Sequence, residues 1–496
     1  MHPIRKTLPA FFLIFSWSCA TVGPDYVPPD KKLPENFSTK LKAVEIEPPK
    51  REEGTTKEPP IPVKKVTQEM LGDWWQTMED HTLSQIIERA ITGNLDLKLA
   101  QSRVREERAR RGIAKAGRFP TIDATGSTTR QQSSKESGIG QTNNLHSTGF
   151  DASWEVDLFG GIQRSIESAE ATVAARQEEL NDTLVTLVAE AALNYIEIRT
   201  FQSRLKAAEK NLKSQEDTLQ IVKDRLASGL TTSLTLEQAN YNLESTKSEI
   251  PTLKIGIEQG KNGLAVLLGE FPGGLKQELD NYKAVPVLPI EVAIGVPADL
   301  LRRRPDIRRT ERELAAQTAR VGVATADLYP KLTLFGSIGL ESLSAASLFT
   351  GPAAAFSIGP KVTWNVFDAG RIRQNIEIED EKQEQSLIQY ELSVLTAVKD
   401  VENALIDYAQ EQVRRKSLIK TSQAANRAVE LARELYAAGL SDFLGVLEAE
   451  RSLFRFQDQL ATSEGSVVSN LIRLYKSLGG GWKPLMADTI DEAPRY

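Results

Sequence analysis

The feature that most constrains this 496-residue sequence is an internal repeat at a constant offset of 210 residues. The paired positions need no gaps wherever we compared them. They include Gly112 with Gly322, Phe119 with Tyr329, Gly126 with Gly336, Trp154 with Trp364, Gly160 with Gly370 and Gly229 with Gly439. A repeat that keeps one register over such a length indicates two copies of one structural unit in the chain, and not two unrelated domains.

Each half contains one very long helical segment. No glycine or proline stands between Gly161 and Gly229, or between Gly370 and Gly439, so we predict single helices over 164–228 and 371–438. Apolar residues recur in both at steps of three and four. They are Leu184, Val188, Ala191, Tyr195 and Ile198 in the first helix, and Val398, Val401, Leu405 and Tyr408 in the second. A plain coiled-coil dimer would satisfy this spacing but would not explain the strands.

Four segments alternate apolar and polar residues as strands do. In 356–370 the apolar face consists of Phe356, Ile358, Val362, Trp364 and Val366. The other segments are 331–340, 146–158 and a weaker one at 121–127. About 10 residues is the length that a tilted strand needs to cross a hydrocarbon layer. We therefore predict two membrane-facing β-hairpins, at about 119–158 and 329–367.

Four strands cannot close into a barrel by themselves. An open edge in lipid leaves backbone groups unpaired, at a cost of several kcal/mol each. Two copies of the chain would give about eight strands and a barrel plugged by its own side chains, whereas three would give about twelve and leave a lumen. Pro360 lacks a ladder donor, so we expect a bulge or an edge strand there.

Large aromatic residues stand at the ends of the predicted strands. Phe119 and Trp154 flank the first hairpin, and Tyr329 and Trp364 flank the second. Because a hairpin begins and ends at the same rim, all four are expected at one membrane interface, where aromatic girdles lie. Aromatic residues that cap a soluble sandwich are the alternative, but helices as long as those predicted here do not follow such a sandwich.

The N-terminus is typical of an export signal. Arg5 and Lys6 precede a short apolar stretch that ends at Cys19, the only cysteine. We predict removal of a signal peptide at 1–18, lipid attachment (palmitate) at Cys19 and an extended tether over 19–66 that is rich in Pro, Lys and Glu. An incidental cysteine is the alternative. Cleavage removes two of the 61 Lys and Arg residues and none of the 67 Asp and Glu residues, so the mature chain has a net charge of −8 (59 − 67). A net negative charge argues against nucleic-acid binding.

The predicted fold is mostly α, with a transmembrane β-barrel part and two tandem repeats. Repeat 1 is predicted at 67–290 and repeat 2 at 291–480, each with helices, a hairpin, a long helix and a return helix, before a C-terminal tail at 481–496. After the signal no segment has 18 uninterrupted apolar residues, so we expect no transmembrane helix.

No catalytic, cofactor or metal site is indicated. Only His2, His81 and His146 are present, without ligand spacing or a nucleophile beside them. The run 302–304 of three arginines precedes a helix start, which favours a structural role. The glycine run 479–481 follows a helix and lacks the Lys-Ser/Thr of a phosphate loop, so it is interpreted as a terminator.

Several motifs closely resemble the TolC-like outer membrane factors, in particular the NodT/OprM-type efflux lipoproteins. They are "WW" at 74–75, "GNLDLKLAQSRV" from Gly93, "LLRRRPDI" from Leu300, "YAAGLSDFLGVLEAERSLF" from Tyr436 and "LGGGW" from Leu478. The resemblance implies a homotrimer in the outer membrane of a Gram-negative bacterium, with a 12-stranded barrel and a helical tunnel that extends into the periplasm. It also implies a periplasmic adaptor and an inner-membrane pump, often of the RND type, as partners.

The resemblance also places the helix breaks at Gly229 and Gly439 at the periplasmic tip. Asp442 and, in the first half, Ser233 can cap the helices that follow. Residues at the matching positions of the family narrow the closed duct. Here these gate positions are Leu444, Glu448 and Tyr436, and three copies of Glu448 around an axis would attract cations.

Three other functions are alternatives to an efflux duct. A type I secretion duct would share the whole architecture. A periplasmic adaptor would have long helical hairpins but no amphipathic strand pairs ending in aromatic residues, and a surface filament would not need a lipid signal together with two hairpins 210 residues apart.

Overall fold

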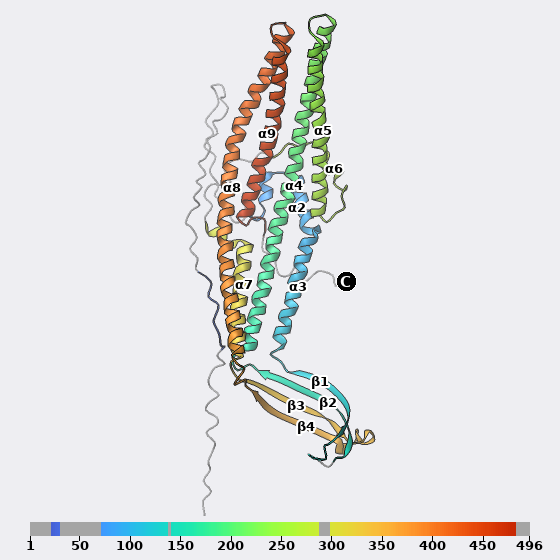
Figure 1. The fold of residues 1–496 in the computed structure, drawn as a ribbon, viewed down its shortest axis with the longest axis vertical. Helices are drawn as coiled ribbons and strands as arrows, with labels where there is room; N and C mark the ends of the chain where they lie inside the picture. The colour runs from blue at the N-terminus through green and yellow to red at the C-terminus, as the bar shows by residue number, and fades with distance from the viewer. Residues whose placement is uncertain (1–20, 30–70, 137–139, 287–297, 483–496) are drawn as a thin grey trace, which may run out of the picture. The chain divides into compact units, whose positions relative to one another are not determined.

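A computed structural model describes residues 21–29, 71–136, 140–286 and 298–482 (Figure 1). The elements of the first half are η1 (Trp74–Met78), α2 (His81–Gly93), α3 (Leu95–Ala116), β1 (Thr121–Gln132), β2 (Thr142–Val156), α4 (Gly161–Ala227), α5 (Ser233–Leu267) and α6 (Lys276–Leu279). Those of the second half are η3 (Ala298–Arg303), α7 (Pro305–Ala326), β3 (Lys331–Ser342), η4 (Ala345–Ser347), η5 (Gly351–Ala353), β4 (Ala354–Thr363), α8 (Arg371–Ala437) and α9 (Phe443–Ser477).

The structure keeps the 210-residue offset element by element. The bounds of α3, β1, α4 and α5 each recur 210 residues later as those of α7, β3, α8 and α9. Among the four strands the last one departs from this, because η4 and η5 fill the loop before β4. The predicted order of helix, two strands, long helix and return helix is confirmed in both halves. The two long helices begin and end within three residues of the predicted positions.

The chain folds into two compact units, and each half of the sequence contributes to both. Among the described residues, unit 1 comprises 21–29, 103–136, 140–177 and 309–391, and unit 2 comprises 71–102, 178–286, 298–308 and 392–482. Unit 1 holds the strands and the adjoining parts of α3, α4, α7 and α8. Unit 2 holds α5 and α9, together with the remaining parts of the long helices.

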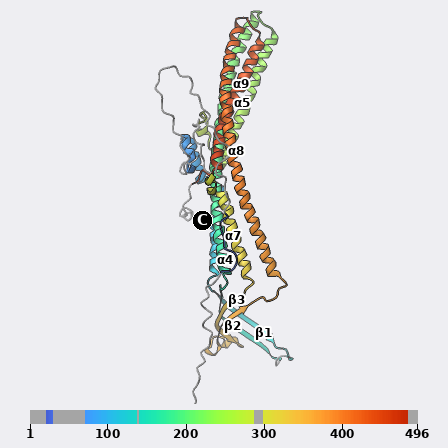
Figure 2. The ribbon, with the colours of Figure 1, turned by 90° about the vertical axis from the view of Figure 1, so that its left-hand side faces the viewer.

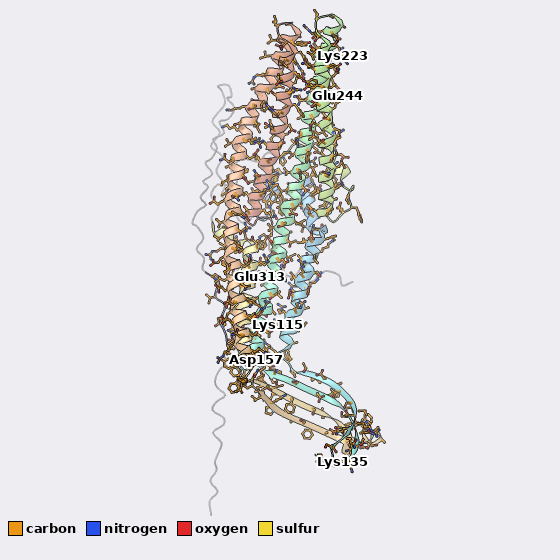
Figure 3. All side chains as sticks on the ribbon, viewed as in Figure 1. Lys115, Lys135, Asp157, Lys223, Glu244 and Glu313 are labelled. Atoms are coloured by element: carbon orange, nitrogen blue, oxygen red, sulfur yellow. The ribbon has the colours of Figure 1, made fainter. Side chains whose placement is uncertain are left out.

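The four strands of unit 1 form one antiparallel sheet in the order β1-β2-β3-β4. In Figures 1 and 2 this sheet is a single curved layer. Figure 3 labels Lys135, after β1, and Asp157, after β2, at its opposite ends. Among the described residues neither β1 nor β4 has a strand on its outer side. Pro360 lies on β4, so the prediction of an edge position is confirmed.

Register gives the sheet one apolar and one mainly polar face. Residues paired across neighbouring strands share a face, and one such row consists of Ala124, Phe150, Ile338 and Phe356. The row on the other face, one residue along, consists of Asp123, Asp151, Ser337 and Ser357. The apolar row ends in Phe356, which is exposed, and the next apolar row ends in the exposed Ile358. Phe335 is an apolar exception on the polar face.

Helix packing and stacked aromatic rings hold unit 2 together. The predicted apolar positions of α4 from Leu184 to Ile198 are all buried, as are Val401, Leu405 and Tyr408 of α8. Trp74 stacks on Tyr475 of α9, with ring centroids 5.4 Å apart. The helix α9 ends at Ser477, before the glycine run, so the terminator interpretation is confirmed. No helix in the described part of the chain has the length and apolarity needed to cross a membrane.

Candidate functional site

The two tryptophans at the strand ends of unit 1 are held in the same way. The indole Nε1 of Trp154 donates to the carbonyl of Arg118, and that of Trp364 donates to the carbonyl of Leu328, each at 3.0 Å. Both donors reach back 36 residues, across their own hairpin. The hairpins are therefore closed by equivalent bonds at the rim where the helices begin.

The aromatic residues predicted at this rim are all solvent-exposed to some degree in the isolated chain. Phe119 and Trp364 are largely exposed, and Trp154 and Tyr329 partly so. Tyr329 also stacks on Phe159, with ring centroids 4.6 Å apart. The four residues lie at the ends of the strands where they were predicted, and their role at a membrane interface stays a prediction.

The helix ends in unit 2 turn at Gly229 and Gly439. Their φ angles of 71° and 74° lie in the left-handed region that glycine adopts without strain. Leu230 donates to the carbonyl of Arg225, and Leu440 to that of Leu435. This pattern is the Schellman motif, which ends a helix and redirects the chain. Figure 3 labels Lys223 and Glu244 close to the first of these turns.

The helices after the two turns are capped differently. Asp442 precedes α9, and its side chain accepts from the backbone N–H of Gly445 at 3.3 Å, as expected. The expectation for Ser233 is wrong, because Thr232 holds the cap position of α5 and Ser233 is already its first helical residue. The hydroxyl of Thr232 lies 3.4 Å from that of Thr235.

The three predicted gate residues have different environments. Leu444 and Glu448 are exposed, one turn apart on α9, and Glu448 lies 4.0 Å from Arg451. Tyr436 is buried: its ring packs edge-on against Phe443, and the guanidinium of Arg225 lies over it, 4.8 Å from the centroid. Leu444 and Glu448 are thus exposed on α9 and Tyr436 belongs to the helix core, and the gate role of all three stays a prediction.

A buried acidic residue, Glu450, joins all four helices near the turns, and sequence reasoning missed it. Its carboxylate accepts from Arg433 of α8 at 2.6 Å, from Thr218 of α4 at 2.7 Å and from Asn242 of α5 at 3.1 Å. Arg433 also donates to the carbonyl of Ser214 at 2.6 Å. We call these five residues the Glu450 cluster.

The sequence contains a signal for this cluster. Glu450 continues the apolar stripe of α9 that runs through Phe443, Val446 and Leu447 to Leu453. A charged residue within such a stripe must be buried, and a buried carboxylate needs donors. Glu448, two positions earlier, falls on the opposite side of the helix.

Cys19 and the arginine run 302–304 are the two remaining predicted features. Cys19 lies outside the described residues. Of the run 302–304, Arg304 is buried and donates to the carbonyl of Ser477 at the end of α9, at 2.7 Å, while pairing with Asp306. This agrees with the structural role predicted for the run.

Comparison with known proteins identifies the family. The sequence matches the family described as "Outer membrane efflux protein" twice, over residues 86–270 and 296–480, which are again 210 residues apart. Nodulation protein T of Rhizobium leguminosarum bv. trifolii is 31% identical over 486 residues, or 98% of this chain and 99% of that protein.

Two further similarities support the match. Pyoverdine export outer membrane protein OpmQ of Pseudomonas aeruginosa is 32% identical over 426 residues, or 83% of this chain and 88% of that protein. The solved structure of the outer-membrane channel OprN superimposes with a TM-score of 0.84 at 33% identity, covering 93% of this chain and 100% of that chain. The fold is that of the TolC-like channels, and the chain is a non-enzymatic outer membrane channel of efflux systems. By sequence and by fold, this chain belongs to the outer membrane efflux protein family.

Proposed function

We propose that the chain is the exit duct of a tripartite efflux system. In this proposal three copies form a 12-stranded barrel and a helical tunnel, anchored by lipid at Cys19. The duct conducts substrates passively to the outside from an inner-membrane pump of the RND type, to which a periplasmic adaptor joins it. Leu444 and Glu448 narrow its periplasmic end.

The open sheet of unit 1 is the observation that carries this proposal. The sheet has an apolar face with exposed Phe356, Ile358 and Val362, and its edge strands β1 and β4 are unpaired within the described chain. Apolar exposure suits lipid, but free edges do not. Pairing β4 of one copy with β1 of the next satisfies both conditions.

The internal repeat supports self-association of the helices as well. Ser168 and Val185 of α4 are 7% and 3% exposed, whereas Ile378 and Leu395, which occupy the equivalent positions of α8, are 51% and 59% exposed. The face of α4 that is buried within the chain is therefore exposed on α8. It is also more apolar on α8, because Ile378 takes the place of Ser168. An exposed apolar stripe of this kind indicates an interface.

The partner for this stripe follows from the same symmetry. Within unit 1 the start of α4 lies against the end of α7: a Cβ on Gly161 would stand 3.1 Å from the Cβ of Ala326. The equivalent residues are Arg371 of α8 and Ala116 of α3, and α3 exposes Ile113. In the proposed trimer α8 of one copy packs on α3 of the next in this register.

Cysteine pairs test the assembly. Arg371→Cys with Ala116→Cys is expected to give disulfide-linked chains on oxidation. The equivalent Cβ atoms of positions 161 and 326 are 3.1 Å apart, close to the roughly 3.5–4.5 Å between Cβ atoms that a disulfide needs. The matched control, Gly161→Cys with Ala326→Cys, should link within one chain and leave its heated migration monomeric. Intrachain links alone from both pairs would refute the interface.

Transport is tested separately in a strain that lacks this chain. Loss of resistance to pump substrates, restored by the wild-type gene, is expected for an exit duct. Unchanged susceptibility with the pump active would remove the proposed function even if the trimer forms.

A further inference from the structure

Residues 21–26, which belong to unit 1, form a strap that lies against α4 and α7 of the same unit. The amide of Val22 donates to the carbonyl of Phe159 at 3.1 Å, just before α4 begins. Four residues on, the hydroxyl of Tyr26 donates to Glu311 of α7 at 3.3 Å. The strap therefore bridges the first repeat, at Phe159, and the second repeat, at Glu311.

Arg164 is the centre of this contact. Its side chain is buried, and its guanidinium donates to the carbonyls of Val22 and Gly23 at 3.1 and 3.3 Å and to the carboxylate of Asp25 at 2.7 Å. A fourth bond, at 2.8 Å, goes to Glu167 on its own helix. A buried arginine that donates three hydrogen bonds to one short segment holds that segment in place.

Glycines provide the clearance that the strap needs. A Cβ on Gly23 would stand 2.4 Å from the Cα of Gly322, and one on Gly160 would stand 2.8 Å from the Cα of Thr21. A Cβ on Gly322 would meet the side chain of Arg164 at 2.8 Å. Any side chain at these positions would force the strap or the arginine away.

The second repeat serves as an internal control. The position equivalent to Arg164 is Gln374, and those equivalent to Gly322 and Gly160 are Gly112 and Gly370. A Cβ on Gly112 or on Gly370 would meet nothing within 4 Å of it in the described chain. The close approach is thus a property of the strap site and not a requirement of the repeated fold.

We infer that Arg164, with Gly160 and Gly322, forms a docking site for residues 21–26 that fixes the lipid anchor at the aromatic rim of the sheet. This inference rests on the proposed lipid attachment at Cys19. Cys19 precedes Thr21 by two residues, so the chain limits their separation to about 7 Å. Phe159, which receives the strap, stacks on the rim residue Tyr329. Arg164 is a positioning residue: it sets where the acyl chains enter the bilayer relative to the strands.

Hydrogen exchange of the full-length trimer in detergent tests the docking. Arg164→Gln, which installs the residue of the second repeat, and Gly322→Ala should each speed exchange of the peptide containing Val22 by about tenfold or more, the effect of losing a charge-assisted bond. Gly112→Ala, the same change in the equivalent helix, should leave that peptide unchanged. Wild-type exchange in the first two variants, or equal acceleration in all three, would overturn the inference.

Two further measurements separate docking from anchoring. A spin label at Val27→Cys, in vesicles, should be immobilised at one depth in the parent and become mobile with Arg164→Gln. An unchanged spectrum would overturn the positioning role. Intact-mass analysis should find Cys19 acylated in every variant. An unmodified Cys19 would refute the anchor in the proposed function, while the exchange result would still decide whether the strap docks.

Discussion

Replacing Glu450 by alanine tests whether the Glu450 cluster ties the helices of unit 2 together. The change removes the acceptor of Asn242. It leaves Thr218 with the carbonyl of Ser214 at 3.1 Å and Arg433 with the same carbonyl at 2.6 Å. Removing one partner of a buried ion pair costs about 3–5 kcal/mol. The side chain of Arg433 is 23% exposed, which places the expected cost at the lower end, about 3 kcal/mol. This corresponds to about a hundredfold more frequent local opening.

Hydrogen exchange of peptides from α4, α5, α8 and α9 near the turns measures this opening directly. Glu448→Ala is the matched control, because the side chain of Glu448 is 65% exposed and only 4.0 Å from Arg451. It should change the opening free energy by less than about 0.5 kcal/mol. The double variant Glu450→Leu with Arg433→Met should recover part of the loss, because it leaves no buried charge although Asn242 still lacks its acceptor. If Glu450→Ala exchanges like Glu448→Ala, the cluster does not hold the helices.

Two other predictions concern the gate and acid stability. Single-channel conductance in planar bilayers should rise for Leu444→Ser, and block by cations should weaken for Glu448→Ala; unchanged traces for both would remove the gate assignment. Asp80→Asn should cost about 1.5–3 kcal/mol at neutral pH, because the carboxylate accepts from Lys283 at 2.6 Å and Tyr195 at 2.7 Å. Burial opposes ionisation, but the bonds from Lys283 and Tyr195 outweigh it and hold the pKa of Asp80 below its ordinary 3.8. The stabilisation is therefore present above pH 3.8 and lost as pH falls through the lowered pKa, so denaturation midpoints of the parent and the variant should converge in acid; a gap independent of pH would contradict this.

The long helices and the strands were predictable because their signals are local. The long runs without glycine or proline in α4 and α8 contain no helix-breaking residue. Alternation of apolar and polar residues identifies strands with two different faces. The turns at Gly229 and Gly439 follow from the backbone freedom of one residue each. The 210-residue repeat then allowed each signal to be checked against its second copy.

The residues that sequence reasoning missed depend on distant partners. Thr218 and Glu450 are 232 positions apart, and Arg164 and Val22 are 142 apart. No pattern within one helix announces such pairs, although a charge in the apolar stripe at Glu450 gives a partial signal. For Tyr436, the resemblance to the family predicted a role at the gate but not the burial of its ring. The burial follows from the packing of Phe443 and Arg225 around the ring.

Comparison of the two repeats separates what the fold requires from what this chain adds. Asn94 and Arg304 are equivalent positions with different residues, yet the first donates to the carbonyl of Leu267 and the second to that of Ser477, which are themselves equivalent. A hydrogen bond that two different side chains make at equivalent positions is a requirement of the fold, because each repeat needs a donor for a carbonyl at the end of its return helix. Arg164 has no such counterpart, because Gln374 stands in its place and no strap reaches that position in the described chain. Interactions present in only one repeat are not required by the common fold. Mutations at the residues that make them should alter anchoring or gating while leaving the common scaffold intact.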